Sequence, residues 1–437
     1  MEVLYIKKLL KSKQSYSLLI FYIGLFLLPS ALSISIIFLL SSLIISSIKL
    51  RKNYLHDHWN IPFALSGFFL ILSSLVNTFF NNHLLNYDLN PSLTWVGLGN
   101  WLPFFWCFWG FQSYVDSPEK RRICGLILIA GSFPVIISGL GQSFFNWDGP
   151  FQTLFGFITW YQRPIDDIFG LTGLFNNPNY AGSWLNSIWP FCLASLITLK
   201  KNNFKRVSTY FFIFGISLSI ILTNSRAAWI GIILSSILLY GKKSLKYLRY
   251  LVFITAFIFL VVKFTIFGGS IHNFLKGIIP ESIWLEFSDF QYTRLKIWES
   301  AFTYIFNHPI FGYGSGSFTE IFKLETGLWK GHAHNLPLEL MVSYGVPAAL
   351  LILIPVTILL ILSTRKIFNI SNIKNNLIFD KAWIVSLIIL IISQLVDVQY
   401  FDGRISLLGW ILLSGSKNML NENLNNYQKN DNNINIV

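Results

Sequence analysis

The stretch from Leu336 to Leu362 reads LPLELMVSYGVPAALLILIPVTILLIL and carries one charged residue, Glu339. A helix needs about 20 apolar residues to cross a hydrocarbon core of roughly 30 Å, so this stretch is long enough to span a membrane. The whole chain has 53% hydrophobic and only 12% charged residues, whereas about a quarter of the residues of ordinary soluble domains are charged. We therefore expect a polytopic membrane protein.

Apolar runs recur along nearly the whole chain. The predicted spans are 15–29, 31–48, 61–79, 96–115, 123–142, 181–199, 207–223, 227–241, 249–267, 336–362, 382–396 and 404–416. The first two are separated only by Pro29 and Ser30, and the count falls if they form one bent or re-entrant unit. The pattern predicts an all-α, polytopic membrane helical bundle of about twelve transmembrane helices.

The spans divide the chain into four expected parts. These are N-terminal transmembrane helices (1–150), a core (151–362) with a large external loop (268–335), C-terminal transmembrane helices (363–416) and a disordered, Asn-rich cytoplasmic tail (417–437). Inside the loop, Leu295, Ile297 and Trp298 recur at helical spacing, which predicts a short amphipathic helix. The long polar loop of a membrane protein is the first place to look for its chemistry.

Charge orients the predicted bundle. Most of the 33 Lys and Arg residues fall in alternate segments between spans, and basic residues near span ends are retained in the cytoplasm. Both termini are then cytoplasmic, and 268–335 and 397–403 are external, which means periplasmic if the source has two membranes. The net charge of +13 is thus mainly a topology signal, and we expect no nucleic-acid partner because no soluble basic face is apparent.

His334 is the best candidate for a catalytic residue. A histidine accepts a proton near neutral pH, and this one lies where the external loop meets an apolar helix, in Gly331-His332-Ala333-His334-Asn335. A histidine bonded to nearby backbone is the structural alternative. His332 and His334 could bind a metal together, but no third or fourth ligand is evident, so we expect no metal and no cofactor.

Two arginines stand on the predicted external side. Arg226 follows Thr223-Asn224-Ser225 in a tight turn between two apolar runs, where it either binds an anion or extends toward the membrane surface as a helix-capping residue. Arg294 begins the amphipathic helix, where backbone N–H groups also favour anions. Its alternatives are a solvated helix face or a contact with lipid phosphate.

Other polar groups are weaker candidates. Arg163 lies near Asp166 and Asp167, which predicts either a carboxylate site or an exposed ion pair. The segment Gly173–Gly182 has turn chemistry and could also donate amide hydrogen bonds to a sugar. The three cysteines all lie in apolar runs, so they predict neither disulfides nor a metal site.

Taken in order, several of these motifs resemble the O-antigen ligase and polymerase superfamily. The resemblance runs over roughly 150–350. Its motifs are Gly173-Leu174-Phe175-Asn176-Asn177-Pro178-Asn179, Ser225-Arg226, Arg294 with Trp298, His308-Pro309-Ile310-Phe311-Gly312-Tyr313-Gly314, and His334-Asn335 with Leu338 and Gly345. The twelve-span topology with a long external loop before the His-Asn helix agrees with it.

The resemblance implies a metal-independent enzyme of the bacterial inner membrane that acts on its periplasmic face. Such an enzyme moves a sugar chain from a polyprenyl diphosphate carrier to an acceptor hydroxyl, on the lipid A core or on a growing glycan. By the same resemblance His334 is the general base, and Arg226 and Arg294 bind the diphosphate. Asn335, Arg163 and His332 are possible accessory residues, and His332 could take the role of His334.

A membrane transporter of a small anion such as bicarbonate is the alternative function. External arginines suit an anion, but a transporter places charged or broken-helix sites near the middle of the bilayer. The predicted spans hold few such residues, with Lys263 and Glu339 close to span ends.

Overall fold

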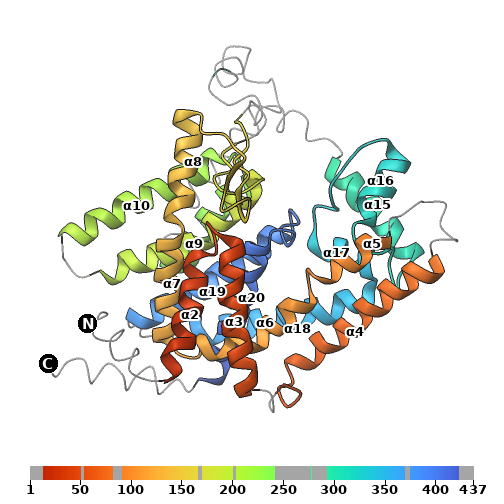
Figure 1. Ribbon diagram of the computed structural model, residues 1–437, viewed down its shortest axis with the longest axis horizontal. Coiled ribbons are helices and arrows are strands. Elements are labelled where there is room, and N and C mark those ends of the chain that lie inside the picture. Colours follow the sequence, from red (N-terminus) through yellow and green to blue (C-terminus); the bar gives the residue numbers. More distant parts are fainter. Residues whose placement is uncertain are drawn as a thin grey trace.

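The computed structural model of the chain is a helical protein (Figure 1). It describes residues 13–50, 54–81, 91–165, 170–199, 203–241, 277, 293–369 and 375–422. The predicted span 249–267 and most of the external loop up to residue 292 lie outside these residues, as do Asp166 and Asp167.

The described residues form the following elements. They are α2 (Lys13–Leu27), α3 (Leu32–Leu50), α4 (Asn60–Val76) with a π-helical end (Asn77–Asn81), α5 (Pro91–Leu98), α6 (Leu102–Gly110) with a 3-10 turn (Phe111–Tyr114), α7 (Pro118–Gly131), α8 (Phe133–Phe145), β1 (Phe151–Thr153), β2 (Ile158–Trp160), α9 (Pro178–Thr198), α10 (Asn203–Leu222), α11 (Arg226–Tyr240), α15 (Thr293–Asn307), α16 (Ser317–Thr326), α17 (Leu336–Tyr344), α18 (Val346–Phe368), α19 (Asn375–Gln394) and α20 (Gly403–Asn421).

Five helical stretches in the described part of the chain are long and apolar enough to cross a membrane. They are Leu32–Leu50, Asn60–Phe79, Pro118–Phe145, Val346–Phe368 and Leu377–Gln394, and three shorter apolar helices accompany them. The expectation of a helical membrane protein is confirmed, whereas the count of twelve spans stays a prediction. The all-α expectation needs one small correction, because Phe151–Thr153 and Ile158–Trp160 pair as an antiparallel hairpin.

Two of the predicted spans are broken by the fold. The predicted span 96–115 is divided between α5 and α6, and the predicted span 336–362 is divided at Gly345. Gly345 has a φ of +85°, which is left-handed backbone that favours glycine. The resulting α17 has nine residues and rises about 13 Å, well short of a bilayer core of roughly 30 Å. This short helix carries the residues next to the candidate site.

The main hydrophobic core surrounds α9. This helix packs against α7, α10, α11 and α19, and it is buried along most of its length, including Trp184 and Phe191. A helix that is apolar all round must be enclosed by others. Gly125 of α7 comes so close to the Phe191 ring that an added Cβ would clash with it. The predicted span 181–199 is therefore the central helix of the bundle.

A second, smaller hydrophobic cluster joins α15, α16 and α17. Its buried members include Ile297, Tyr304, Phe318, Ala333 and Val342, and Figure 1 shows these helices grouped away from α2, α3 and α9. Ile297 is buried, as expected for the apolar face of an amphipathic helix, whereas Leu295 of the same predicted pattern is exposed. The predicted external loop thus contains short helices, and they pack on the start of the helix that follows it.

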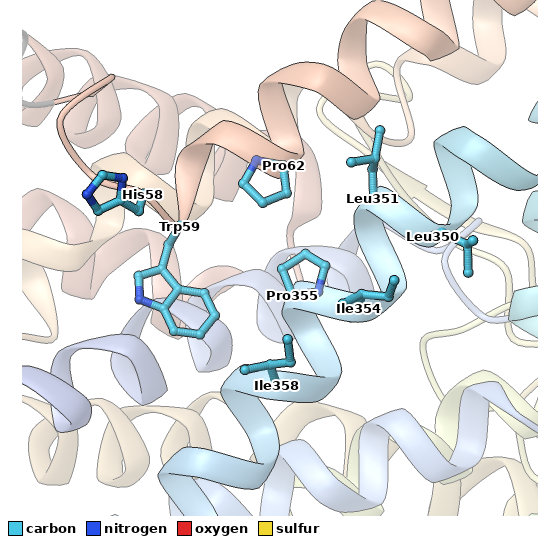
Figure 2. A pocket seen from close by; sticks show the side chains of 8 residues that line it. All are labelled: His58, Trp59, Pro62, Leu350, Leu351, Ile354, Pro355 and Ile358. Carbon is cyan, nitrogen blue, oxygen red and sulfur yellow. The ribbon is translucent and has the colours of Figure 1, made fainter.

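An apolar groove of about 400 Å³ runs between α4 and α18 (Figure 2). Its lining side chains are His58, Trp59, Pro62, Leu350, Leu351, Ile354, Pro355 and Ile358. None of these is a predicted site residue. A groove with this lining suits hydrocarbon chains better than a polar reactant.

The C-terminal helix extends past the predicted end of the last span. α20 reaches Asn421, and Lys417 is buried with its Nζ bonded to Asp57 and Gln112. The first residues of the predicted tail are therefore part of the folded bundle.

Candidate active site

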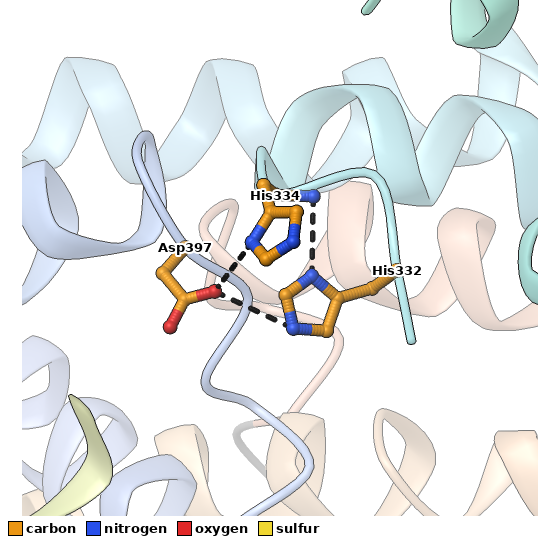
Figure 3. A group of neighbouring side chains, drawn as sticks. All are labelled: His332, His334 and Asp397. Carbon is orange, nitrogen blue, oxygen red and sulfur yellow. Dashed lines mark hydrogen bonds and ion pairs between the residues drawn. The ribbon is translucent and has the colours of Figure 1, made fainter. Parts of the chain in front are cut away.

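His332, His334 and Asp397 meet at one carboxylate oxygen (Figure 3). The Nδ1 atom of His334 lies 3.0 Å from Oδ1 of Asp397, and Nε2 of His332 lies 3.4 Å from the same oxygen. The two imidazole rings are 4.3 Å apart, edge to face. Residues separated by more than sixty positions thus form one cluster next to the N-terminus of α17.

The local sequence explains why the His334 side chain is held in place. Asn335 caps α17 by accepting the N–H of Leu338 at 3.1 Å, and its own amide donates to the carbonyl of Leu395 at 2.9 Å. Asn is among the preferred N-cap residues. His334 has a φ of +49°, an uncommon conformation for a residue with a side chain. The cap and the bond to Leu395 support this backbone.

Glu339 holds the loop that carries His332 and His334. Its Oε2 accepts the N–H of Ala333 at 2.9 Å, and Ser343 lies 3.5 Å from its other oxygen. The side chain is 1% exposed. Burial raises the pKa of Glu339 to about 7, against the lowering effect of the hydrogen bonds from Ala333 and Ser343. A buried carboxyl group is therefore bonded directly to the backbone between the two histidines.

The hydrogen bonds define which ring nitrogens carry protons. Nδ1 of His332 accepts the backbone N–H of His334 at 3.1 Å, so the neutral ring carries its proton on Nε2, facing Asp397. An ionised carboxylate only accepts hydrogen bonds, so Nδ1 of His334 is also protonated. Nε2 of His334 then holds a lone pair, and no residue in the described part of the chain donates to it. The site thus presents one nitrogen with the properties of a general base.

Burial and charge set the protonation states around this base. Burial lowers the pKa of His332 to about 4, and the charges of His334 and Arg294 add to this against the opposing effect of Asp397. Burial alone would raise the pKa of Asp397, but the hydrogen bond from His334 and the nearby histidines hold it below its usual value. At neutral pH the cluster contains an ionised Asp397 and a neutral His332.

The same three side chains offer the donor set of a metal site. One ligand atom from each lies within 4.8 Å of the others, and two histidines with one carboxylate suit divalent transition metals. The fold thus supplies the third ligand that the sequence did not reveal. A ligating nitrogen must present a lone pair, however, and both nitrogens that face Asp397 carry protons in this hydrogen-bond pattern. The expectation that no metal binds here stays a prediction.

The segment 395–404 connects this cluster to the Gly173–Gly182 segment. Arg404 donates to the carbonyl of Leu174 at 3.0 Å, and its guanidinium lies 3.7 Å from the centre of the Phe175 ring. Arg404 also pairs with Asp402 through two bonds, from Nε and from Nη2. Two motifs that are far apart in sequence are therefore attached to one connection between α19 and α20.

Arg226 lies on a turn that packs against the same region. It is the first residue of α11 and is exposed. Before it, Thr223 Oγ1 accepts the N–H of Ser225 at 3.2 Å, and the carbonyl of Leu222 accepts the N–H of Leu171 at 2.8 Å. The turn that carries Arg226 thus contacts the segment that Arg404 holds.

The other two predicted basic residues differ in their relation to the cluster. Arg294 is exposed in the first turn of α15, and its charge contributes to the lowered pKa of His332. Arg163 is exposed, while its backbone N–H is held by Thr172 at 3.2 Å. The structure relates Arg294 electrostatically to the histidines, and it gives Arg163 no such relation among the described residues.

Asp397 is the residue that sequence reasoning missed. It was placed in the short external segment 397–403, but no motif or spacing connected it with His334. An acidic residue that directly follows the apolar run 382–396 is the one available signal, because such residues are expensive near a membrane and are often functional.

The comparisons with known proteins agree with the motif order. Residues 210–353 match the family model described as O-antigen ligase. No curated protein matches the sequence significantly. The matched residues include Arg226, Arg294, His332, His334 and Asn335, whereas Asp397 and the Gly173–Asn179 motif lie outside them. The resemblance to the O-antigen ligase superfamily is therefore confirmed over 210–353, the part of this membrane protein that matches the O-antigen ligase family model.

Proposed function

We propose that the protein is a membrane glycan transferase that moves a sugar chain from a polyprenyl diphosphate carrier to an acceptor hydroxyl. The observation that carries the proposal is the Nε2 lone pair of His334. It is set by the Asp397 bond to Nδ1, in a loop that belongs to an O-antigen ligase domain. The match to this family supports a glycan-ligating membrane enzyme, and the finer steps below are ours.

His334 acts as the general base in this mechanism. Its Nε2 removes the proton from the acceptor hydroxyl, and the oxygen attacks the anomeric carbon of the donor sugar in line with the departing phosphate. A new C–O bond forms as the sugar–phosphate bond breaks, and the carrier leaves as its diphosphate. Asp397 stabilises the imidazolium formed at His334, because an ionised carboxylate 3.0 Å from Nδ1 favours the charged ring.

Arg226 and Arg294 bind the diphosphate in the same step. Guanidinium groups match phosphate geometry with paired hydrogen bonds, and positive charge stabilises negative charge that develops on the leaving group. The position of Arg294 within electrostatic range of His332 supports this role. Arg226 is assigned by the family resemblance and by its place on the turn next to the Gly173–Gly182 segment.

His332, Asn335 and Arg163 are accessory residues in the proposal. His332 shares Asp397 with the base, and Asn335 holds the His334 backbone through its bond to Leu395. Arg163 is included on the family resemblance alone. The proposed mechanism uses no metal.

The reaction takes place on the outer face of the bacterial inner membrane, with both chain termini in the cytoplasm. The acceptor is the lipid A core or a growing glycan. The apolar groove between α4 and α18 is one place where a hydrocarbon chain could lie against the protein.

Deletion of the gene tests the proposal. Surface glycans are resolved by gel in the deletion strain and after complementation with the wild type or with His334→Gln at matched expression. Loss of all bands above the core indicates a ligase, and core plus one repeat indicates a polymerase. Failure of His334→Gln to restore either pattern supports the mechanism. Full restoration by this variant contradicts it.

The same strains also test the alternative function, a bicarbonate transporter. The O-antigen ligase match lends it no support. An unchanged glycan profile together with reduced bicarbonate uptake in the deletion strain would favour transport.

A further inference from the structure

The Asp397 loop presents an exposed aromatic ring beside the histidine pair. Phe401 is 41% exposed. Its ring centre lies 6.2 Å from that of His332, with the two planes inclined by 28°. His332 in turn lies 4.3 Å from His334. Phe401 is therefore an exposed aromatic ring next to the histidine pair.

The Phe401 ring is attached to a rigid support. Its neighbour Tyr400 is 5% exposed, lies 4.2 Å from the Phe401 ring, and packs on Trp101 at 4.9 Å. The Tyr400 carbonyl accepts the hydroxyl of Ser406 at 2.9 Å, and Asp402 begins α20 as its N-cap. The backbone on both sides of Phe401 is thus fixed by buried groups, although its own ring is open to solvent.

A second exposed aromatic residue lies close to the histidine loop. Trp329 is 68% exposed, and the edge of its ring is near Gly331, where an added Cβ would be 3.4 Å from it. Gly331 directly precedes His332. Exposed aromatic rings thus come from both segments that build the site, the loop before α17 and the connection before α20.

This combination of apolar faces and hydrogen-bonding groups matches the chemistry of a sugar. A pyranose ring has a face of C–H groups that packs on the negative face of an aromatic ring, and hydroxyls around its edge that bond to imidazole and carboxylate groups. Phe401 offers the first, and His332, His334 and Asp397 offer the second. A lipid chain would leave Nε2 of His334 without a partner, which is unfavourable.

We propose that Phe401, with Trp329, forms the platform that binds the acceptor glycan through the C–H face of a sugar ring and directs its hydroxyl toward His334. The inference rests on the proposed transfer function and adds the position of the acceptor.

Binding without the donor tests the platform separately from catalysis. The full-length protein in lipid nanodiscs is titrated with oligosaccharides released by mild acid from the surface polysaccharide of the source strain, and binding is followed by saturation-transfer NMR. We expect Phe401→Leu, which keeps an apolar side chain, to weaken binding about tenfold, Trp329→Ala to weaken it less, and Phe401→Tyr to retain it. Phe306→Ala is the matched control, because Phe306 is 79% exposed on α15 and is given no role.

The kinetic test uses the acceptor concentration. Phe401→Leu should raise the KM for the acceptor about tenfold and change kcat and the KM for the donor less than twofold. The platform is overturned if the wild type binds none of these oligosaccharides, or if Phe401→Leu and Phe306→Ala bind them as the wild type does. Such a result would leave transfer by the wild type and its loss in His334→Gln intact. Glycan binding through Phe401 without any transfer activity would instead contradict the proposed function.

Discussion

The Arg121 cluster and the His334 cluster both bring distant charged residues together, but only one of them leaves a group without a partner. Arg121 of α7 is completely buried and donates to Asp380, Glu422 and the carbonyl of Val115. These bonds use every N–H that a guanidinium offers. His334 is 27% exposed on its side chain and commits only Nδ1.

The difference separates structural from functional polar groups. A buried charge that meets all its hydrogen-bonding partners holds helices together and has nothing left for a substrate. In the Arg121 cluster, the bonds from Arg121 to Asp380 and Glu422 connect α7 with α19 and with the end of α20. A group held from one side, with a lone pair on the other, is prepared for a reaction. The number of satisfied donors and acceptors therefore distinguishes the two clusters better than their charge does.

The largest expected effect comes from breaking the Arg121 cluster. Asp380→Ala removes a paired carboxylate and leaves a buried guanidinium, which costs about 3–5 kcal/mol. We expect little folded protein, measured by fluorescence-detected size-exclusion chromatography in detergent. Glu422→Gln is the control, because Glu422 is 15% exposed and should cost less. Wild-type yield and Tm for Asp380→Ala would show that the cluster is not structural.

Asp397→Asn tests the His334 cluster in the same comparison. Asparagine can donate to Nδ1 of His334 and so favours the ring form that lacks the Nε2 lone pair. We expect about a 10- to 100-fold loss of kcat with Tm unchanged within a few degrees, and a pH–rate profile displaced from that of the wild type. Asp402→Asn in the same connection is the matched control, since it should change Tm more than kcat. Equal kcat for Asp397→Asn and the wild type would remove Asp397 from the mechanism.

Glu339→Gln tests a buried carboxyl group that is hydrogen-bonded, like the Arg121 cluster, but lies next to the His334 cluster. Its pKa of about 7 in the folded protein exceeds the ordinary value of 4.5. The folded state therefore binds this proton more tightly than the unfolded state does. The stability that the bound proton contributes is fully present below about pH 4.5 and is lost as the pH rises to 7. Glutamine stays neutral and can still accept the Ala333 N–H. We expect the Tm of Glu339→Gln to exceed that of the wild type by about 2–4 °C at pH 8 and to match it near pH 4.5. A constant difference at all pH values would contradict this assignment.

The smallest expected effect is that of metal removal. Because protons occupy the nitrogens that face Asp397, dialysis against EDTA should change transfer activity less than twofold. Readdition of Mg²⁺, Mn²⁺ or Zn²⁺ to the dialysed protein should give no stimulation. A tenfold loss on dialysis that Zn²⁺ or Mn²⁺ reverses would show that the three side chains bind a catalytic metal.

Local patterns predicted much of the fold but not the site as a whole. Apolar runs show in the sequence because a bilayer requires about 20 such residues, and α9 and α19 lie where the runs predict. The break at Gly345 was missed, since its cause is close packing against the segment that includes Ile310, a contact distant in sequence. Asp397 was missed for the same reason. His334 was found because it lies at a visible junction and beside an N-cap asparagine.

The position of Asp397 has a consequence for how this protein can be divided. The matched domain ends at residue 353, yet the carboxylate that sets the His334 proton comes from the connection between α19 and α20. A chimera that receives only the matched residues would inherit the histidine without its partner. The working module is therefore discontinuous, and an exchange between relatives must carry the last two helices together with the domain.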